Sequence, residues 1–303
     1  METTARKVFM VRPDSFSFNE QTSSTNTFQQ KDNLVSKEFI AEMALQEFKA
    51  CTRILEQNNI EVLVYTHNNS ESLPDAVFPN NWFCHLPDKR LVLFPMQSPS
   101  RRKERIPEFG AWLSSQGVIV SETIDLTFLE DENAFLEGTG SLIFDHQKHC
   151  GWAALSARTS PKAIEHFCMA TGYAITSYKT IPFQGANVYH TNVIQAISPK
   201  LMILAKELVE DGFHLPLFNS IADSEREILI ISAHQMQHFC GNILFACNQS
   251  GTPFWIMSET AMLAFNTEQI KKLRQHAELL VFPVNFIEKT GGGSARCMLA
   301  EIF

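Results

Sequence analysis

The chain has 303 residues, of which 45% are hydrophobic and 19% are charged, and its formal net charge at pH 7 is −8. This composition can bury a sizeable core and argues against a disordered chain. Acidic and basic residues are mixed along the sequence, without a basic stripe or an RNA-binding aromatic motif. We therefore expect neither nucleic acid nor an anionic membrane surface as a partner.

Seven cysteines, an odd number, are scattered along the chain, and none belongs to a Cys-x-x-Cys pair. This spacing favours neither a zinc knuckle nor a dithiol redox pair. The N-terminal residues do not resemble a signal peptide, and no apolar run approaches the length of a membrane span. We therefore expect a reduced, cytoplasmic compartment.

The first elements are a short apolar strand at residues 7–11, a helix at 37–57 and a strand at 60–65. The helix is predicted from apolar residues that recur at helical spacing. The stretch 14–33, between the first strand and the helix, is rich in Asn, Gln, Ser and Thr. A polar loop of this length is usually functional or mobile, and an ordinary surface excursion is the alternative.

Later elements repeat the order strand, strand, helix, strand, although no repeat is visible at the level of single residues. We predict strands at 90–95, 118–124, 142–144, 152–155 and 193–197, and further helices near 104–116, 161–172, 219–226 and 260–277. No linker or low-complexity boundary divides the chain. One α/β domain spanning residues 1–303 is preferred over two.

The stretch 291–298 contains three consecutive glycines followed by Cys297. Three glycines cost conformational entropy and suit a backbone that turns tightly or approaches a ligand. The last residues of the chain are typical of a short strand, which would hold the cysteine at the mouth of that strand. A glycine loop that delivers one thiol to a fixed place indicates a nucleophile. The alternative is a C-terminal turn with a buried, inert cysteine.

Several polar clusters share one arrangement, in which a functional side chain lies beside a small residue at the edge of an apolar strand. They lie at residues 75–81, 137–141, 189–192 and 291–297. If each module contributes one such edge, these groups converge on a central site. A cysteine, a histidine and a carboxylate from different modules would then form a nucleophile, an acid/base and an orienting group.

Each group has a role in such chemistry and also a plainer explanation. A free thiol has a pKa near ~8.5, so a cation beside it would favour the reactive thiolate. The histidine would protonate a departing amine and later activate water. However, His190 is one of ten histidines, and Glu137 could accept backbone hydrogen bonds in a turn. Asn80 and Asn81 could be turn residues.

Six short motifs, taken in order, resemble the guanidine-modifying superfamily of amidinotransferases, arginine deiminases and dimethylarginine dimethylaminohydrolases. The resemblance runs from the first strand to Cys297 and implies the pentein fold, a five-bladed ββαβ propeller. The likeness is greatest to the branch described as citrulline-utilisation hydrolases, often labelled amidinotransferase. The motifs are Asp75-Ala-Val-Phe-Pro-Asn-Asn81, Arg101-Arg102-x-Glu104, Leu136-Glu137-Gly138, Ser156-x-Arg158-Thr159, His190-Thr-Asn192 and Gly-Gly-Gly-Ser-Ala-Arg-Cys297.

The resemblance implies a role for each matching residue. Cys297 would be the nucleophile, His190 the general acid/base, and Glu137 the carboxylate that holds the reacting nitrogens. Substrate contacts would come from the polar residues of the other motifs. These are Asp75, Asn80 and Asn81 for the guanidine and amine, Arg101 and Arg158 for the α-carboxylate, and Asn192 as a further substrate contact.

Three departures from the arginine deiminase pattern remove carboxylates. Asn81 and Asn192 stand where those enzymes have aspartate, and Gly140 also replaces an aspartate. Burying a guanidinium without paired carboxylates is costly, whereas an asparagine amide can donate to and accept from a neutral ureido group. Asparagine at the position of Asn81 is also found in arginine dihydrolases. Asp75 and Glu137 remain available for a cation.

We therefore interpret the chain as a cysteine-dependent hydrolase of a non-peptide C–N bond in a ureido or guanidino amino acid. Citrulline, or arginine, would be converted to ornithine without a metal or organic cofactor. The alternatives are an amidinotransferase, an arginine deiminase, and a non-catalytic pentein binding protein. The sequence does not give the oligomeric state, and a homodimer stays an open alternative.

Overall fold

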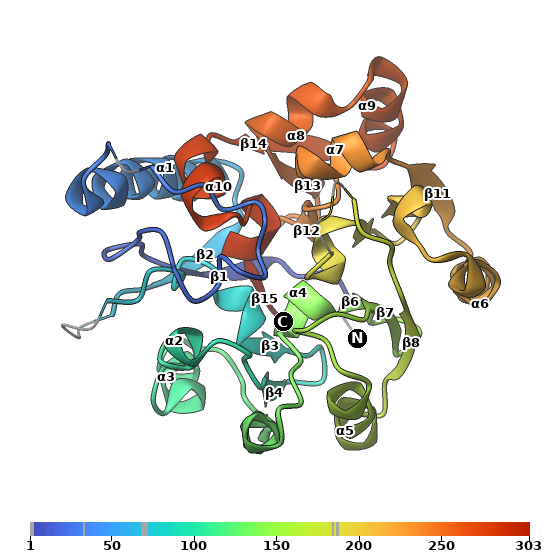
Figure 1. Ribbon diagram of the computed structural model, residues 1–303, viewed down its shortest axis with the longest axis horizontal. Helices are drawn as coiled ribbons and strands as arrows, with labels where there is room; N and C mark the ends of the chain where they lie inside the picture. Colours follow the sequence, from blue (N-terminus) through green and yellow to red (C-terminus); the bar gives the residue numbers. More distant parts are fainter. Residues whose placement is uncertain (1–2, 33, 68–71, 184, 186–187) are drawn as a thin grey trace.

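The computed structural model describes residues 3–32, 34–67, 72–183, 185 and 188–303. Its strands form five three-stranded sheets arranged around one centre, like the blades of a propeller (Figure 1). In every blade the middle strand pairs antiparallel on one side and parallel on the other. A parallel pair needs a crossover connection, and a helix supplies it each time. The predicted ββαβ propeller is confirmed.

The first blade joins the two ends of the chain, because its strands are β15 (Ala300–Ile302), β1 (Lys7–Val11) and β2 (Glu61–Tyr65). The other four blades are contiguous in sequence. They consist of β3 (Phe83–His85), β4 (Arg90–Leu93) and β5 (Glu122–Asp125); β6 (Ile143–Asp145), β7 (Cys150–Ala154) and β8 (Ala174–Tyr178); β9 (Gln195–Ile197), β10 (Leu201–Leu204) and β11 (Glu227–Ile230); and β12 (Leu244–Cys247), β13 (Pro253–Ser258) and β14 (Glu278–Phe282).

The crossover helices lie on the outside of the ring (Figure 1). They are α1 (Lys37–Gln57), α2 (Pro99–Arg102) with α3 (Phe109–Ser115), α5 (Pro161–Thr171), α6 (Asp211–Ala222), and α8 (Glu259–Ala264) with α9 (Thr267–Arg274). Two more short helices, α7 (Ala233–Gln237) and α10 (Asn285–Gly291), lead from one blade towards the next. Among the described residues, no helix combines the length and apolar character that a bilayer crossing requires.

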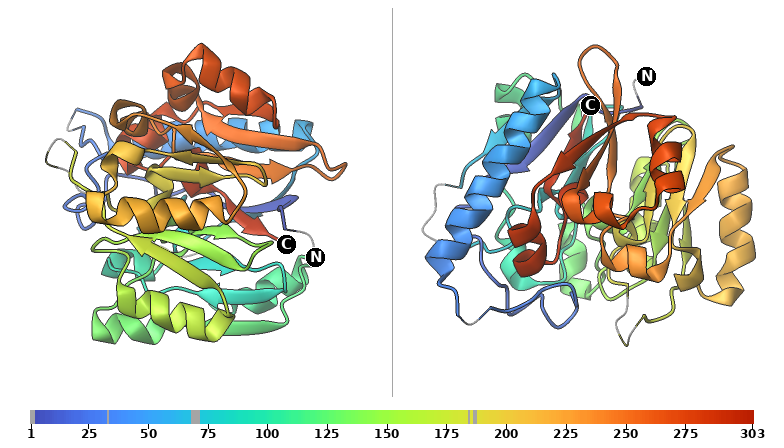
Figure 2. Two further views of the ribbon diagram at one scale, coloured as in Figure 1. Left: turned by 90° about the vertical axis from the view of Figure 1, so that its right-hand side faces the viewer. Right: turned by 90° about the horizontal axis from the view of Figure 1, so that it is seen from above.

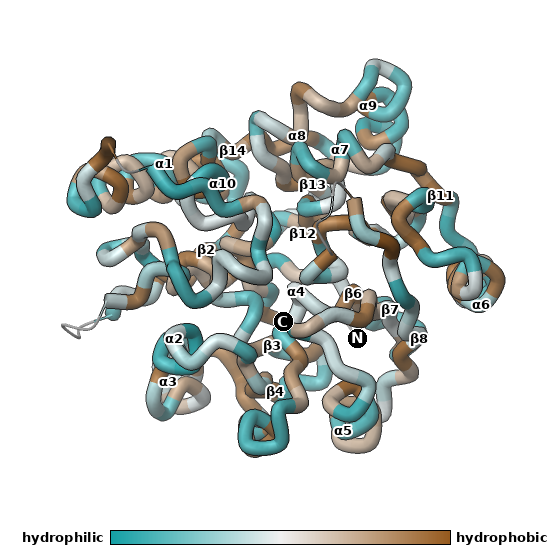
Figure 3. The backbone as a smooth tube through the Cα atoms, in the orientation of Figure 1, coloured by the Kyte–Doolittle hydropathy of each residue, from teal (hydrophilic) through white to brown (hydrophobic). Residues whose placement is uncertain are grey.

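Helix α1 illustrates how the outer helices attach to the ring. Ser36 accepts a hydrogen bond from the Phe39 N–H and so caps the first turn. One face of α1 then buries residues spaced three or four apart, which is the period of an amphipathic helix. Hydrophobic and hydrophilic residues also alternate along the other outer helices (Figure 3). The buried residues are Ile40, Ala44, Phe48, Cys51 and Leu55.

Some predicted bounds were wrong. The helix expected near 219–226 is α6 (Asp211–Ala222), whose Gly212 and Pro216 have low helix propensity. Packing of Leu217 and Ile221 against the core overrides that propensity. The helix expected at 260–277 is two helices, because Asn266 begins α9 with a capping box. The strand expected at 118–124 is the shorter β5.

Short turns at the centre of the ring precede the first strand of a blade. Four of these turns are far apart in sequence but linked by contacts. Turn α4 (Gly138–Ser141) contacts both η1 (Pro79–Asn81) and η3 (Thr191–Val193), and η1 also contacts η5 (Ala295–Met298). These turns include or adjoin the polar clusters predicted from the sequence. The ring therefore brings the edges of different modules to one place.

Closure of the ring should make residues 1–303 unfold as one cooperative unit. Ile302 is 2% exposed and pairs across β15 and β1 with Lys7. We expect Ile302→Ala to lower the free energy of unfolding by about 2–4 kcal/mol, with circular dichroism and tryptophan fluorescence reporting one shared transition. The same change at Ile119, which is 67% exposed, should have little effect. Two separate transitions would contradict the single unit.

Candidate active site

Three of the predicted functional side chains come from three different blades and are buried. Cys297, in η5 before β15, is 3% exposed, His190 before β9 is 2% exposed, and Glu137 before β6 is fully buried. Cys297 and His190 line the same small cavity, together with Asp75 and Asn81. The convergence expected from the sequence is therefore present in the structure.

Glu137 and His190 form a buried hydrogen-bonded pair, with 2.8 Å between Oε2 and Nε2. Burial alone would raise the pKa of Glu137, but Arg158 and the hydrogen bond from His190 outweigh it and hold the pKa at about 2. Burial lowers the pKa of His190 to about 4, against the opposing effect of Glu137. At neutral pH the carboxylate is ionised and the imidazole is neutral. Because an ionised carboxylate only accepts, Nε2 carries the proton and Nδ1 is left as an acceptor.

Two side-chain amides face the sulfur of Cys297. Asn242 Nδ2 lies 3.2 Å from Sγ, and Asn192 Nδ2 lies 3.7 Å from it. The orientation of the Asn242 amide is set by its Oδ1, which accepts from the Arg296 N–H at 3.1 Å. Asn242 was not among the predicted site residues. The sequence signal that could have indicated Asn242 is the glycine directly before it, ahead of β12. A Cβ on Gly241 would come within 2.2 Å of the Val193 carbonyl oxygen, so the fold requires glycine at this position.

Four buried polar atoms around this site have no protein partner. They are Asp75 Oδ1, Asn80 Oδ1, Asn81 Nδ2 and Asn192 Oδ1. An unpaired buried donor or acceptor costs about 1–3 kcal/mol, so a bound ligand that pairs with them would gain that energy. Burial raises the pKa of Asp75, against Arg101 and the hydrogen bonds from Asn19 and Thr22. The site thus offers both donors and acceptors and few free charges.

Arg101 is occupied by protein groups in this conformation. It donates to both carboxylate oxygens of Glu104, to Asn81 Oδ1 at 2.5 Å, and to the carbonyl oxygens of Asp75 and Phe78. Its guanidinium therefore holds the stretch 75–81 and orients the Asn81 amide. Contact of Arg101 with a substrate carboxylate stays a prediction.

Arg158 links Glu137 to the polar stretch that follows β1. Its Nη1 lies 3.4 Å from Glu137 Oε2, and Nη2 donates to Thr25 Oγ1 at 2.6 Å and to the Thr22 carbonyl oxygen. Its guanidinium also lies over the Tyr189 ring, 5.0 Å from the centroid. We call residues 14–32 the covering segment; residue 33, the last of the polar stretch, lies outside the described residues.

The covering segment closes the site. Asn19 Nδ2 and Thr22 Oγ1 donate to Asp75 Oδ2 at 2.8 and 3.1 Å, and Asn26 donates to the Gly291 carbonyl oxygen. Figure 2 shows this segment and α10 on the face of the ring opposite both termini. The enclosed cavity measures about 20 Å³, which is room for roughly one water molecule. An amino acid does not fit in this volume, and a role of the covering segment as a lid stays a prediction.

The three glycines before Cys297 are explained by close packing and by backbone conformation. A Cβ on Gly291 or Gly293 would come within 2.8 Å of the Phe78 ring. Gly292 ends α10 with φ of 65°, in the left-handed region that glycine tolerates. The close approach of the glycine backbone is therefore an approach to protein side chains. The Phe78 ring lies against Gly291 and Gly293, and Asn26 of the covering segment lies against Gly292.

Comparison with known proteins agrees with this architecture. Residues 12–303 match the family described as N,N dimethylarginine dimethylhydrolase, eukaryotic. Among curated proteins, no sequence match to the chain was found.

Solved structures share the fold at low sequence identity. The N-terminal domain of ArgZ, described as an arginine dihydrolase from the ornithine–ammonia cycle in cyanobacteria, is 17% identical, with a TM-score of 0.76 and 97% of each chain covered. AgrE with L-arginine is 16% identical, with a TM-score of 0.76 over 98% of this chain and 40% of its own. A dimethylarginine dimethylaminohydrolase bound to S-methyl-L-thiocitrulline is 12% identical, with a TM-score of 0.66 over 98% of this chain and all of its own.

The family match spans nearly the whole chain. The chain therefore belongs to this family, described as eukaryotic N,N dimethylarginine dimethylhydrolase, and it has the pentein fold.

The low pKa of His190 predicts how stability depends on pH. The pKa of about 4 in the folded chain lies below the unfolded value near 6.5. The unfolded chain therefore binds more protons between those values, and stability falls as the pH falls. Between pH 7 and pH 5, the free energy of unfolding should fall by about 2 kcal/mol more in the wild type than in His190→Gln. Urea unfolding at the two pH values measures this difference. His234→Gln, at an exposed position, should follow the wild type, and parallel curves for His190→Gln would contradict this burial effect.

Proposed function

We propose that this member of the family hydrolyses a C–N bond of an arginine-derived amino acid through a covalent intermediate on Cys297. The observation that carries the proposal is the small cavity that Cys297 and His190 both line, with Glu137 hydrogen-bonded to the His190 imidazole. A nucleophile, a base and an orienting carboxylate are the groups that acyl-transfer chemistry requires. A protein that only binds ligands needs none of them.

In the proposed reaction, the thiol proton of Cys297 passes to the neutral imidazole of His190 as sulfur attacks the planar carbon. The ionised Glu137 stabilises the imidazolium that results, as the carboxylate of a hydrolase triad does. His190 then gives that proton to the departing nitrogen, and the C–N bond breaks. Water, deprotonated by His190, attacks the carbon of the covalent adduct and releases the thiol.

We propose citrulline, or arginine through two successive hydrolyses, as the substrate and ornithine as the product. Asn81 Nδ2 and Asn192 Oδ1 are an unpaired donor and acceptor, and both suit a neutral ureido group. Asp75 and Glu137 supply the negative charge that a guanidinium needs in the first step. The structural likeness to a protein described as an arginine dihydrolase supports the two-step reaction.

A second candidate is release of an alkylamine from an N-methylated arginine, which the family description favours. It uses the same nucleophile and differs only in the departing group. Arginine deiminase activity and transfer of the amidino group to an acceptor amine also share the first step. The released products separate these reactions.

Arg158 is the proposed partner of the substrate α-carboxylate. Its guanidinium now binds Thr25 Oγ1 and the Thr22 carbonyl oxygen, both in the covering segment. A carboxylate is a stronger acceptor for guanidinium than these neutral oxygens. In the proposed complex, the substrate carboxylate replaces these two oxygens as the hydrogen-bond acceptor of Arg158.

We also propose a reducing, cytoplasmic environment. All seven cysteines are free thiols in the structure, Cys297 among them. A thiol nucleophile keeps its reactivity where the surroundings are reducing.

The substrate proposal is tested with purified protein given citrulline, arginine or N,N-dimethylarginine in parallel, following ammonia, dimethylamine, citrulline and ornithine. We expect ornithine and ammonia from citrulline or arginine, and loss of turnover by at least about 10³-fold in Cys297→Ser. Dimethylamine as the main product would favour the second candidate. Citrulline accumulating from arginine would contradict the argument from the asparagines.

Asn242 should contribute to catalysis through its bond to Sγ. A hydrogen bond to a charged group contributes about 1.5–3 kcal/mol, so Asn242→Ala should lower kcat roughly 10- to 100-fold. Asn242→Asp keeps the shape and the acceptor for the Arg296 N–H, but places a negative charge beside the thiolate. We expect the aspartate variant to be the slower of the two. An aspartate variant as active as the wild type would exclude this role.

A further inference from the structure

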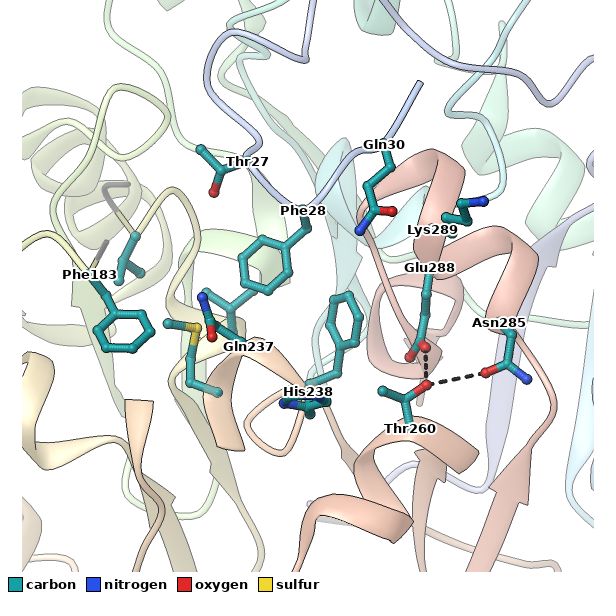
Figure 4. Close-up of a pocket in the computed structure, with 14 residues that line it drawn as sticks. Thr27, Phe28, Gln30, Phe183, Gln237, His238, Thr260, Asn285, Glu288 and Lys289 are labelled. Carbon is teal, nitrogen blue, oxygen red and sulfur yellow. Dashed lines mark hydrogen bonds between the residues drawn. The ribbon is translucent and has the colours of Figure 1, made fainter. Parts of the chain in front are cut away.

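A second cavity lies beside the covering segment, outside the site at Cys297 (Figure 4). Its volume is about 520 Å³, against about 20 Å³ at the nucleophile, and the two cavities share no lining residue. Ligand sites in proteins measure about 300–1,000 Å³. This cavity is therefore large enough for a small organic molecule.

The two sides of the cavity differ in chemistry. One side is apolar, and its rings Phe28 and Phe239 lie 5.1 Å apart. The opposite side is polar, and Figure 4 shows Glu288, Asn285 and Thr260 across the cavity from Phe183. An amphipathic ligand fits such a lining, with its apolar part on one side and a hydrogen-bonding group on the other. The apolar lining residues are Phe28, Phe183, Val188, Val193, Met236 and Phe239.

The charge on the polar side favours a cation. Glu288 is 4% exposed and accepts from Thr260 Oγ1 at 2.6 Å and Ser294 Oγ at 2.5 Å. Within the described part of the chain, no lysine, arginine or histidine forms an ion pair with Glu288, although His238 lines the same cavity and its charge lowers the pKa of Glu288. Lys289, the nearest basic lining residue in sequence, is paired with Asp32.

A buried carboxylate without a cation is costly. Its two oxygens can accept about four hydrogen bonds, and three hydroxyl groups, those of Ser258, Thr260 and Ser294, donate to them. Burial raises the pKa of Glu288, against the hydroxyl donors and His238. A ligand ammonium would supply a positive charge, and the aromatic rings across the cavity add attraction for a cation.

We propose that this cavity is a binding site for a small organic amine, with its ammonium at Glu288 and its apolar body among Phe28, Phe183 and Phe239. The site is separate from the one at Cys297, and its ligand need not be a substrate.

Two short paths connect this site to the nucleophile. Glu288 accepts from Ser294 Oγ, and the Ser294 carbonyl oxygen accepts from the Cys297 N–H at 3.0 Å. On the other side, Phe28 of the covering segment packs edge-to-face on Tyr189 at 6.0 Å. Tyr189 lines the cavity at Cys297 and donates to the Gly292 carbonyl oxygen.

Binding is tested by isothermal titration calorimetry of the full chain with three probes of one shape: 2-phenylethylamine, 2-phenylethanol and 3-phenylpropionate. We expect one amine to bind per chain, about tenfold more tightly than the alcohol, because a charged hydrogen bond exceeds a neutral one by about 1.4 kcal/mol. The propionate should bind more weakly than the alcohol. Equal affinity for all three, or no binding of the amine, would overturn the proposal.

Variants locate the site. Glu288→Gln should remove the preference of amine over alcohol, and Met236→Trp should fill the cavity and abolish binding. If Met236→Trp does not fold, Phe183→Ala, at a half-buried position, should weaken binding of both probes. Phe128→Ala removes a phenylalanine that is 50% exposed and outside the cavity, and its affinities should match the wild type. An unchanged preference in Glu288→Gln would contradict the assignment.

Competition separates the two sites. We expect 2-phenylethylamine to bind Cys297→Ser with wild-type affinity. Saturating arginine should leave the number of amine molecules bound per chain unchanged. Displacement of the amine by arginine would place it at the catalytic site and overturn the proposal. This binding test does not depend on which substrate the enzyme uses, so it can fail while the proposed hydrolysis stands.

Discussion

Antiparallel pairing of β15 with β1 is the constraint on which the site depends. The last strand of the chain enters the first blade, and the turn directly before it carries Cys297. The end of the strand is held further by the Phe303 N–H, which donates to His85 Nδ1 at 3.0 Å. Only the closed ring places Cys297 at the cavity that His190 of the fourth blade also lines, where Glu137 of the third blade is bonded to the His190 imidazole. Folding and assembly of the site are therefore one event.

Charge burial is the second constraint. Arg101 with Glu104, and Arg158 with Glu137, are ion pairs whose side chains are at most 3% exposed. Desolvating such pairs costs several kcal/mol per ion, and apolar residues in their place are often equally or more stabilising. Their value here is orientation, because Arg101 fixes the Asn81 amide and Arg158 fixes Glu137. These ion pairs therefore define the arrangement of donors and acceptors in the site, at a cost in the stability of the fold.

The sequence predicted the polar edges because short motifs are local signals, and the ring was implied by the resemblance to the guanidine-modifying superfamily. It did not reveal Asn242, since its role appears only when Gly241 packs on the Val193 carbonyl and the fifth blade meets Cys297. Arg101 lines the cavity at Cys297, and the sequence did not reveal that its donors bind Glu104 and backbone carbonyls, which lie close only in the folded chain. Its contact with a substrate carboxylate stays a prediction. The bounds of α6 were misjudged because burial of Leu217 and Ile221 outweighs the low propensity of Pro216.

The central claim is that the reaction passes through a covalent bond to Cys297. The most direct measurement is a single-turnover reaction with enzyme in excess over arginine, quenched with acid over time and analysed by peptide mass spectrometry. The account predicts an amidino or carbamoyl group on the peptide that contains Cys297, appearing and decaying in step with product. Product formation while that peptide stays unmodified throughout would contradict it.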